Sequence, residues 1–315
     1  MTAPSQGQAT SDPDPASQPG SAPRSGTAPV PPGPASPAPG PGVLTLGLLV
    51  ALTMAAFAAN SVLTRYAVSL QGMAPLTFAV LRTTAGAAVL MALARPRLSL
   101  APTRLAGAAT LATYMIGFSW AYGALDAGLG ALILFGCVQL GMFGWTALCG
   151  TAIPRRSWAG SAIALGGLAL LLWPSGAVAV PLLPALSMIA AGLGWAAYTL
   201  LGRGSTDPLA TSALNFALCL PLVAAALMQS GTIGPLTPPA LAAALASGAV
   251  TSGLGYALWY RLLPRLATTT AATAQLSVPL IAVAGGALLL SEPLTLRLGL
   301  SAALVLGGIA LSLRR

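Results

Sequence analysis

From Val43 to the C-terminus, the sequence alternates between apolar stretches and short polar interruptions. Most of these stretches are about 20 residues long, the length at which a helix with a rise of about 1.5 Å per residue spans the hydrocarbon core of a bilayer. They are apolar on every face and do not alternate with a period of two, which favours helices over the strands of a membrane barrel. The pattern therefore predicts an all-α membrane protein with ten transmembrane helices, at residues 43–66, 75–94, 104–124, 129–149, 157–174, 182–202, 209–228, 239–262, 267–290 and 296–313.

Residues 1–42 have a different composition. They hold 12 of the 27 prolines, and most of the other positions are Ala, Gly, Ser, Thr or Gln. They contain no basic region leading into a short apolar core, so a secretory signal peptide is not expected. Such a segment cannot bury enough apolar surface to offset the entropy lost on folding, and we expect it to be a disordered, solvated tail.

Composition agrees with a membrane protein, because 56% of the residues are hydrophobic and only 6% are charged. A soluble domain has roughly 25% charged residues. All 14 basic residues are arginines, there is no histidine, and only five acids oppose them. The arginines are scattered between apolar stretches rather than gathered in a basic patch, so we expect no nucleic-acid partner. The three cysteines lack the spacing of a metal site, and no cofactor is expected.

The arginines are distributed asymmetrically between the two sides predicted for the loops. Positively charged short loops stay on the cytoplasmic side of a membrane. If the N-terminus is inside, the outer segments hold only Arg65 and Arg297, and Arg82 lies within a helix. We therefore predict a multi-pass protein of the cytoplasmic membrane with both termini, including the tail, in the cytoplasm. The arginines on that side are Arg24, Arg95, Arg97, Arg104, Arg155, Arg156, Arg203, Arg261, Arg265, Arg314 and Arg315.

Two pairs of similar segments indicate an internal repeat. Residues 162–170 resemble residues 303–311, and residues 75–82 resemble residues 208–215. Both matches fit two five-helix halves, at 43–175 and 182–315, and an odd number of helices in each half turns the second half upside down relative to the first. Inverted repeats are typical of secondary transporters, in which the substrate site lies near the midplane between the halves.

Four motifs carry a family resemblance: Ala-Asn60-Ser-Val-Leu-Thr-Arg65, Pro75-Leu-Thr-Phe-Ala-Val-Leu-Arg82, Thr270-Ala-Ala-Thr-Ala-Gln275-Leu-Ser-Val-Pro279 and Leu290-Ser-Glu292-Pro-Leu-Thr. In order and spacing, the chain from Val43 to Arg315 resembles the EamA-type transporters of the drug/metabolite transporter superfamily. The resemblance implies a ten-helix fold of two inverted EamA-like repeats. It also implies a cavity for small metabolites, lined mainly by the first, third, fourth, sixth, eighth and ninth helices.

The first half departs from this pattern. It carries Gln139 and Ala152 where the second half carries Pro279 and Glu292. A proline that kinks a helix is thus matched by an amide, which argues against matching kinks in the fourth and ninth helices. Gln139 is a candidate substrate contact, and the alternative is an interhelical hydrogen bond.

Arg82 lies about seven residues inside the second predicted helix, where a charge is costly and faces protein or water. It is either the counter-ion of a substrate carboxylate or a structural arginine that binds backbone carbonyls. Aromatic and amide side chains on the neighbouring helices could bind an amphipathic solute by stacking and hydrogen bonds, and they favour a neutral or zwitterionic solute over a polyanion. The candidate substrate-binding residues are Asn60, Arg82, Tyr114, Gln139, Trp195, Tyr198, Tyr256 and Gln275.

Other readings of some polar and aromatic residues stay open. Glu292 and Asp126 could carry a coupling proton or, as the alternative, cap helices, in the case of Glu292 the tenth. Arg65 is expected to anchor the first helix at the interface. The aromatic residues could instead pack or form an interfacial belt, which suits Trp120, Tyr122 and Trp259 best. Glycine pairs at 166–167 and 307–308 would let the fifth and tenth helices pack closely, or pack against a second subunit in a homodimer.

These observations favour a secondary transporter that exports small amphipathic metabolites or drugs, such as amino-acid-like or aromatic solutes, by alternating access. Its partners would be the solute and the membrane lipids. A membrane enzyme acting on lipid-linked substrates is an alternative, but the chain has no histidine and no close pair of acids outside its tail. A non-catalytic membrane scaffold is the other alternative. No phosphate-binding glycine loop is present, so an ATP-driven pump is not expected.

Overall fold

The computed structural model describes residues 43–97, 99–150, 154–173, 180–202, 205–266 and 274–313, and the predicted tail lies outside them. Within these ranges the chain is helical and contains no strand, so the all-α fold is confirmed. The first half contains α1 (Val43–Arg65), its π-helical extension η1 (Tyr66–Leu70), α2 (Pro75–Ala94), α3 (Pro102–Ala121), α4 (Ala127–Leu148) and α5 (Arg155–Leu172). The second half contains α6 (Leu182–Gly202), α7 (Pro208–Ser230), α8 (Pro238–Ala246), the π-helical η2 (Ser247–Leu254), α9 (Gly255–Leu262), the 3-10 turn η3 (Leu263–Arg265), α11 (Ser277–Leu290) and α12 (Leu296–Leu313).

Six helical stretches in the described residues are long and apolar enough to cross a membrane. Two of the predicted spans, at α11 and α12, are shorter apolar helices, and α3 and α5 fall outside the six. That all ten predicted stretches cross the bilayer therefore stays a prediction. The six stretches are Leu44–Leu70, Pro75–Ala94, Ala127–Leu148, Leu182–Gly202, Pro208–Ser230 and Pro238–Arg265.

Prolines mark several helix starts. Each of α2, α3, α7 and α8 begins with a proline, a position where the missing N–H has no partner within the helix. Pro279 is the third residue of α11, and the helical residues Ala274 and Gln275 precede that helix, with a turn at Leu276 between them. The helical path is thus interrupted just before the proline, and the expected kink stays a prediction.

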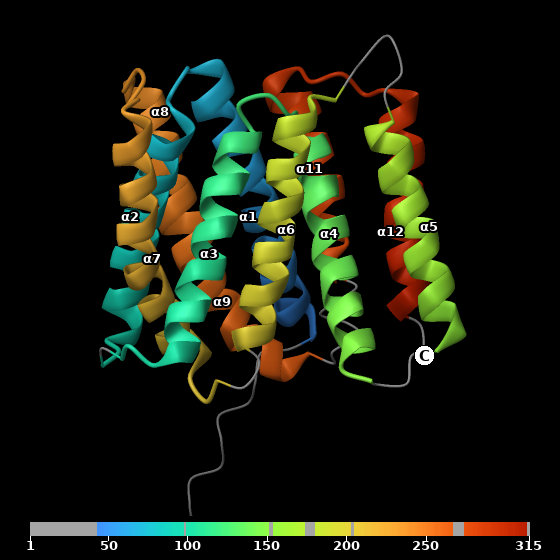
Figure 1. Cartoon of the computed structure of the whole chain (residues 1–315), viewed down its shortest axis with the longest axis horizontal. Coiled ribbons are helices and arrows are strands. Elements are labelled where there is room, and N and C mark those ends of the chain that lie inside the picture. The colour runs from blue at the N-terminus through green and yellow to red at the C-terminus, as the bar shows by residue number, and fades with distance from the viewer. Residues whose placement is uncertain are drawn as a thin grey trace, which may run out of the picture. The chain divides into compact units, whose positions relative to one another are not determined.

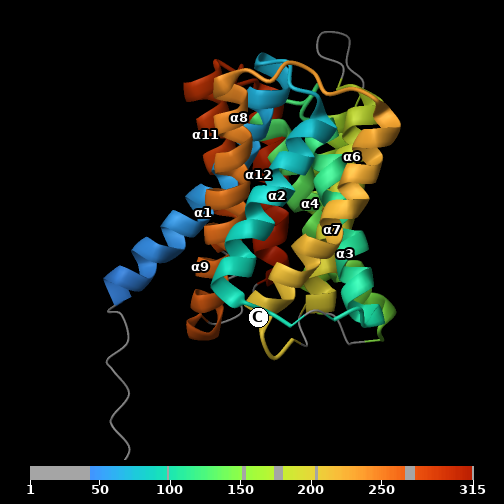
Figure 2. The same cartoon turned by 90° about the vertical axis from the view of Figure 1, so that its left-hand side faces the viewer.

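Successive helices run in opposite directions, so the connections alternate between the two ends of the bundle (Figure 1). The closest helix pairs are α5 with α12, α3 with α6, and α2 with α7, while α4 packs against both α6 and α11. α1 packs against α11, η2 and α9, but its N-terminal half leans away from the other helices (Figure 2). Leu44, Leu48 and Leu52 in this half are accordingly exposed.

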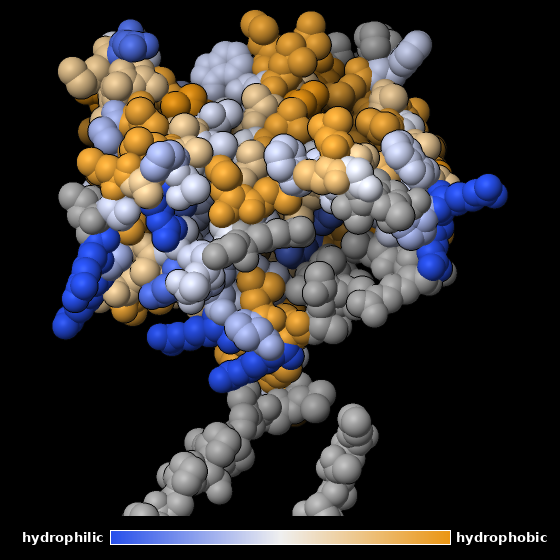
Figure 3. Space-filling model, turned by 60° about the horizontal axis from the view of Figure 1, so that its bottom comes forward, coloured by the Kyte–Doolittle hydropathy of each residue, from blue (hydrophilic) through white to orange (hydrophobic). Residues whose placement is uncertain are grey.

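Charged and apolar side chains occupy different parts of the surface. Figure 3 turns the lower end of Figure 1 forward, and hydrophilic residues project around it, whereas apolar residues cover much of the flank. This end carries the connections between α2 and α3, α4 and α5, and α9 and α11. The arginine-rich end is defined by its exposed arginines, Arg95, Arg97, Arg155, Arg156, Arg261 and Arg265.

Glycines bring α5 and α12 into backbone contact. A Cβ at Gly160 would collide with the carbonyl oxygen of Gly308, and a Cβ at Gly308 would collide with that of Gly160. Gly167 is similarly covered by α12. In contrast, a Cβ added at Gly166 or Gly307 would have no neighbouring atom within 4 Å. In each predicted pair, one glycine therefore lies in the contact between α5 and α12, namely Gly167 and Gly308. The expected homodimer stays a prediction.

We expect Gly308→Leu to destabilise the protein strongly, because the added side chain must displace the main chain of α5. Overpacking of this kind costs about 1–3 kcal/mol or more. Gly307→Leu is the matched control, since it adds the same side chain to the adjacent, uncovered position of α12. Thermal unfolding in detergent should show a lower midpoint for Gly308→Leu only. Equal midpoints for the two variants would contradict the α5–α12 contact.

Candidate functional site

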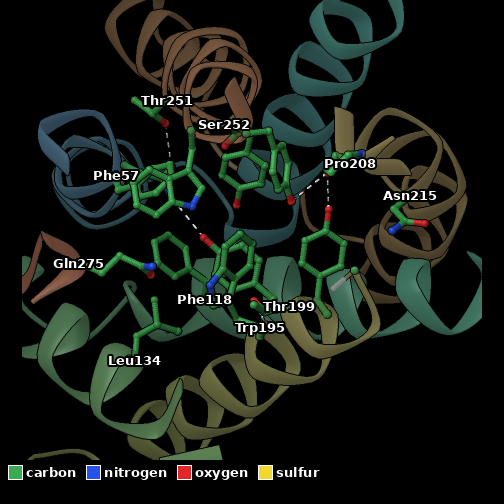
Figure 4. A pocket seen from close by; sticks show the side chains of 18 of the residues that line it. Phe57, Phe118, Leu134, Trp195, Thr199, Pro208, Asn215, Thr251, Ser252 and Gln275 are labelled. Carbon is green, nitrogen blue, oxygen red and sulfur yellow. Dashed lines mark hydrogen bonds between the residues drawn. The ribbon is translucent and has the colours of Figure 1, made fainter. Parts of the chain in front are cut away.

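A cavity of about 320 Å³ lies between α1, α3, α4, α6, α7, η2 and α9, with Gln275 as a further lining residue. Its volume is in the range of small-molecule sites. Figure 4 shows Gln275 and Asn215 on opposite sides of the cavity, with Phe57, Phe118 and Trp195 between them. None of the side chains that line it in the described part of the chain is charged.

Aromatic rings form much of the cavity wall, and Trp195 is their centre. Its ring centroid lies 4.9 Å from that of Tyr114, 5.3 Å from that of Tyr198 and 5.3 Å from that of Tyr256. Neighbouring centroids at this separation are typical of attractive aromatic pairs. The cluster therefore offers broad apolar faces to the ring or hydrocarbon part of a solute.

Uncharged polar groups lie between these rings. The Tyr198 hydroxyl and the Ser212 hydroxyl are 2.9 Å apart, and Ser212 Oγ donates to the Tyr260 hydroxyl at 3.1 Å. Asn215 Oδ1 is buried and has no hydrogen-bond partner among the described residues. A solute can thus find both donors and acceptors here, because hydroxyl and amide groups supply both.

Arg82 lies behind the wall and does not line the cavity. It is completely buried, with Nε donating to Ser252 Oγ at 3.1 Å and Nη2 donating to the Tyr114 hydroxyl at 2.8 Å. Its guanidinium carbon is 4.9 Å from the ring centroid of Phe118. Ser252, Tyr114 and Phe118 all line the cavity, so they separate the charge from the open space.

The structure gathers most of the predicted binding residues around this one cavity. Those that line it are Asn60, Tyr114, Trp195, Tyr198, Tyr256 and Gln275. Gln139, half-buried on α4, is not among the lining residues, and Arg82 contacts only the wall. Their contact with a substrate stays a prediction.

Sequence reasoning missed the polar residues of α7 and η2. α7 was not among the helices expected to line the cavity, yet it contributes Thr211, Ser212 and Asn215. η2 contributes Thr251 and Ser252 from a segment rich in glycine and hydroxyl side chains. The concentration of small polar residues in an otherwise apolar span is the signal that could have identified these lining residues.

The three residues expected in an interfacial aromatic belt differ in exposure. Trp120 is 43% exposed, and its place in such a belt stays a prediction. Tyr122 is wholly buried and donates to the Ala127 carbonyl oxygen at 3.2 Å, while Trp259 is buried in the cavity wall. For Tyr122 and Trp259 the expected place in a belt is wrong, because their neighbours in the fold cover them.

Three charged residues form an ionic cluster beyond the cavity. Arg65 Nη2 lies 2.9 Å from Asp126 Oδ1, and Arg65 Nε lies 3.3 Å from Glu292 Oε1. Arg65 is only 16% exposed and is held by both acids, and its predicted role as an interface anchor stays a prediction. It lies four residues after the lining residue Ser61 on α1, about 6 Å further along the helix. The cluster therefore lies beyond the end of the cavity that Ser61 lines.

Glu292 caps a different helix from the one expected. Both of its carboxylate oxygens accept from the backbone N–H of Ala127, at 2.8 and 2.9 Å, so it caps α4 and not the tenth helix. Ser291, whose φ of 56° is left-handed, ends α11 and turns the chain toward this position. Burial raises the pKa of Glu292, and Asp126 adds to the effect, whereas the Ala127 N–H and Arg65 oppose it.

The other end of the cavity reaches the arginine-rich end of the bundle. There it is lined by Gly202 at the end of α6, Pro208 at the start of α7 and Leu263 after α9. The cavity is therefore asymmetric, with an ionic cluster beyond one end and helix termini at the other.

The chain is similar to known proteins in both sequence and fold. The model of the EamA-like transporter family matches residues 182–314. The uncharacterized protein PA1977 of Pseudomonas aeruginosa is 48% identical over 269 residues, which are 84% of this chain and 93% of that protein. The uncharacterized transporter YwfM of Bacillus subtilis is 28% identical over 214 residues, 66% of this chain and 72% of that protein. A crystal structure with 18% identity shares the fold, with a TM-score of 0.59 over 85% of this chain and 96% of its own.

The raised pKa of Glu292 predicts a pH dependence of stability. Because the folded protein binds this proton more tightly than the unfolded chain does, the contribution is fully present below pH 4.5 and is lost as the pH rises through the raised pKa. We expect the unfolding temperature in detergent to fall across this window, and to fall less in Glu292→Gln. Asp207→Asn, at an exposed helix cap, should retain the wild-type slope. A Glu292→Gln profile parallel to that of the wild type would exclude this assignment.

Proposed function

Because the chain belongs to the EamA-like transporter family of the drug/metabolite transporter superfamily, we propose that this multi-pass membrane transporter is a secondary active exporter of small amphipathic metabolites or drugs. Amino-acid-like and aromatic solutes fit best. The cavity carries the proposal, since it is uncharged, has aromatic walls and lies inside the helix bundle. A family of transporters also favours transport over the membrane-enzyme and scaffold alternatives.

Alternating access fits the asymmetry of the cavity. In the described conformation the cavity reaches the arginine-rich end, while the cluster of Arg65, Asp126 and Glu292 lies beyond the other end. For a solute to leave past this cluster, Arg65 must separate from at least one of its two carboxylate partners. Asp126 and Glu292 are our candidates for coupling this step to a proton.

We propose two inverted five-helix repeats, at 43–175 and 182–315, and ten membrane-spanning helices. The pattern of helix contacts supports this, because α2, α4 and α5 each pack against the helix five places later, namely α7, α11 and α12. The contact of α3 with α6 corresponds to the contact of η2 with α1. In each case the third helix of one repeat packs against the first helix of the other. The family model also matches a range that coincides with the second repeat.

Orientation can be tested with a native cysteine. We propose that the arginine-rich end faces the cytoplasm, as positively charged loops do. Cys149 is exposed after α4, at this end, whereas Cys137 and Cys219 are buried. A membrane-impermeant maleimide should therefore label the protein in inside-out vesicles and not in intact cells. Cys149→Ser should abolish the signal, and labelling of intact cells at Cys149 would reverse the orientation.

Transport can be tested by counterflow in liposomes that contain the purified protein. We expect saturable exchange of at least one labelled member of a panel of aromatic amino acids, aromatic carboxylates, aromatic amines and nucleosides. Trp195→Ala should reduce that flux roughly tenfold, because it removes the central aromatic face of the cavity. Trp145→Ala, at an exposed position on α4, is the matched control. Absence of saturable flux for every solute, with folded protein, would refute the proposal.

A further inference from the structure

The hydroxyl group of Tyr114 has an unusual set of partners. Its oxygen accepts from Nη2 of Arg82 at 2.8 Å and from Nδ2 of Asn60 at 3.4 Å. A hydroxyl has two acceptor positions and one proton to donate. Both acceptor positions are occupied, and no described residue accepts the proton. Because Tyr114 lines the cavity, the proton is available to an acceptor on a bound solute.

The neighbours of Asn60 fix the direction of these hydrogen bonds. Asn60 Oδ1 accepts from the hydroxyl of Ser247 on η2, while the Thr251 hydroxyl, 3.3 Å from the same oxygen, donates to the Ser247 carbonyl oxygen at 2.7 Å. The amide nitrogen is thereby turned toward Tyr114. Because two donors already point at the Tyr114 oxygen, its O–H group is left to donate a hydrogen bond to a solute in the cavity.

The positive charge of Arg82 has no negative partner. The acids in the described part of the chain are Asp126 and Glu292, which both pair with Arg65, and Asp207, which caps α7. Arg82 is completely buried, its Nη1 has no hydrogen-bond partner among the described residues, and its other hydrogen bonds go to neutral hydroxyls. A buried charge in this state is unfavourable, and an anion held nearby relieves it.

The guanidinium also strengthens the hydrogen bond that Tyr114 can make. A hydroxyl whose oxygen accepts from a cation is polarised, so its own proton becomes a better donor. The rest of the lining is uncharged and offers no carboxylate to hold an ammonium group. Among the described lining residues, Tyr114 is a donor that is hydrogen-bonded to Arg82, and its ring lies against that of Trp195.

We propose that the cavity selects monoanionic aromatic carboxylates. The carboxylate of the solute accepts a hydrogen bond from the Tyr114 hydroxyl, and its ring packs against Trp195. Arg82 acts through Tyr114 as a positioning residue and does not touch the solute. This inference rests on the proposed transport function and makes it more specific, because it names the class of solute. It replaces the expectation of a neutral or zwitterionic solute with a solute of one negative charge.

Three compounds that share a ring and a chain length test this selectivity: 3-phenylpropionate, 3-phenylpropionamide and 3-phenylpropylamine. Their affinities for the full-length protein in detergent would be measured by calorimetry. We expect the carboxylate to bind at least about tenfold more tightly than the amide, the effect of one hydrogen bond to a charged group, and the amine to bind most weakly.

Variants then assign the preference to one hydroxyl. Tyr114→Phe keeps the ring beside Arg82 and removes the donor, so the carboxylate should lose about tenfold in affinity while the amide changes little. Tyr198→Phe is the matched control, because it removes a cavity hydroxyl that is bonded to Ser212 rather than to Arg82. It should leave the ratio of the two affinities unchanged. Arg82→Gln should abolish the preference, and if it does not fold, Tyr114→Phe still decides the question.

Three results would overturn the inference: equal affinity for carboxylate and amide, no binding of any of the three compounds, or a Tyr114→Phe variant with the wild-type ratio. Counterflow of labelled 3-phenylpropionate separates this outcome from failure of the proposed function. Selective binding without flux would refute transport of this solute class and leave the binding site standing. Saturable flux of other solutes, without carboxylate preference in binding, would refute only the inference.

Discussion

The complete burial of Arg82 is a constraint that much of the surrounding structure satisfies. A charge in an apolar bundle is unfavourable unless polar groups surround it. α3 supplies the Tyr114 hydroxyl and η2 supplies the Ser252 hydroxyl, while the ring of Phe118 lies against the guanidinium. Gly248 permits this arrangement, because a Cβ there would collide with the main chain of Arg82. The side chains of the cavity wall therefore also supply the polar and aromatic contacts that the buried guanidinium needs.

Half-buried Arg65 and fully buried Arg82 differ in their partners. Arg65 is paired with two carboxylates, and one of these also satisfies the free N–H at the start of α4. This arrangement joins the end of α1, the start of α4 and the connection after α11. Arg82, in contrast, has only neutral partners. The bundle thus concentrates negative charge beyond one end of the cavity and leaves positive charge beside its middle.

The family resemblance and the all-α fold could be predicted from sequence, because apolar length and proline position are local signals. The site could be predicted only in part. Six expected residues line the cavity, but the environments of Glu292, Tyr122 and Trp259 were misjudged. Each of these depends on a partner or cover distant in the sequence, as when Glu292 reaches α4. The role of α7 was missed for the same reason, since hydroxyl groups on one helix reveal nothing about which helices they face.

The pair α5 and α12 contributes no residue to the cavity lining, and it packs chiefly within itself and on α4. Its glycine contact and the aromatic wall therefore share no side chains. Substitutions at distant, independent sites have nearly additive effects on stability. During evolution, the wall can accumulate changes in solute preference without weakening this helix pair. Diversification of specificity and maintenance of the scaffold are thus separable within a single small bundle.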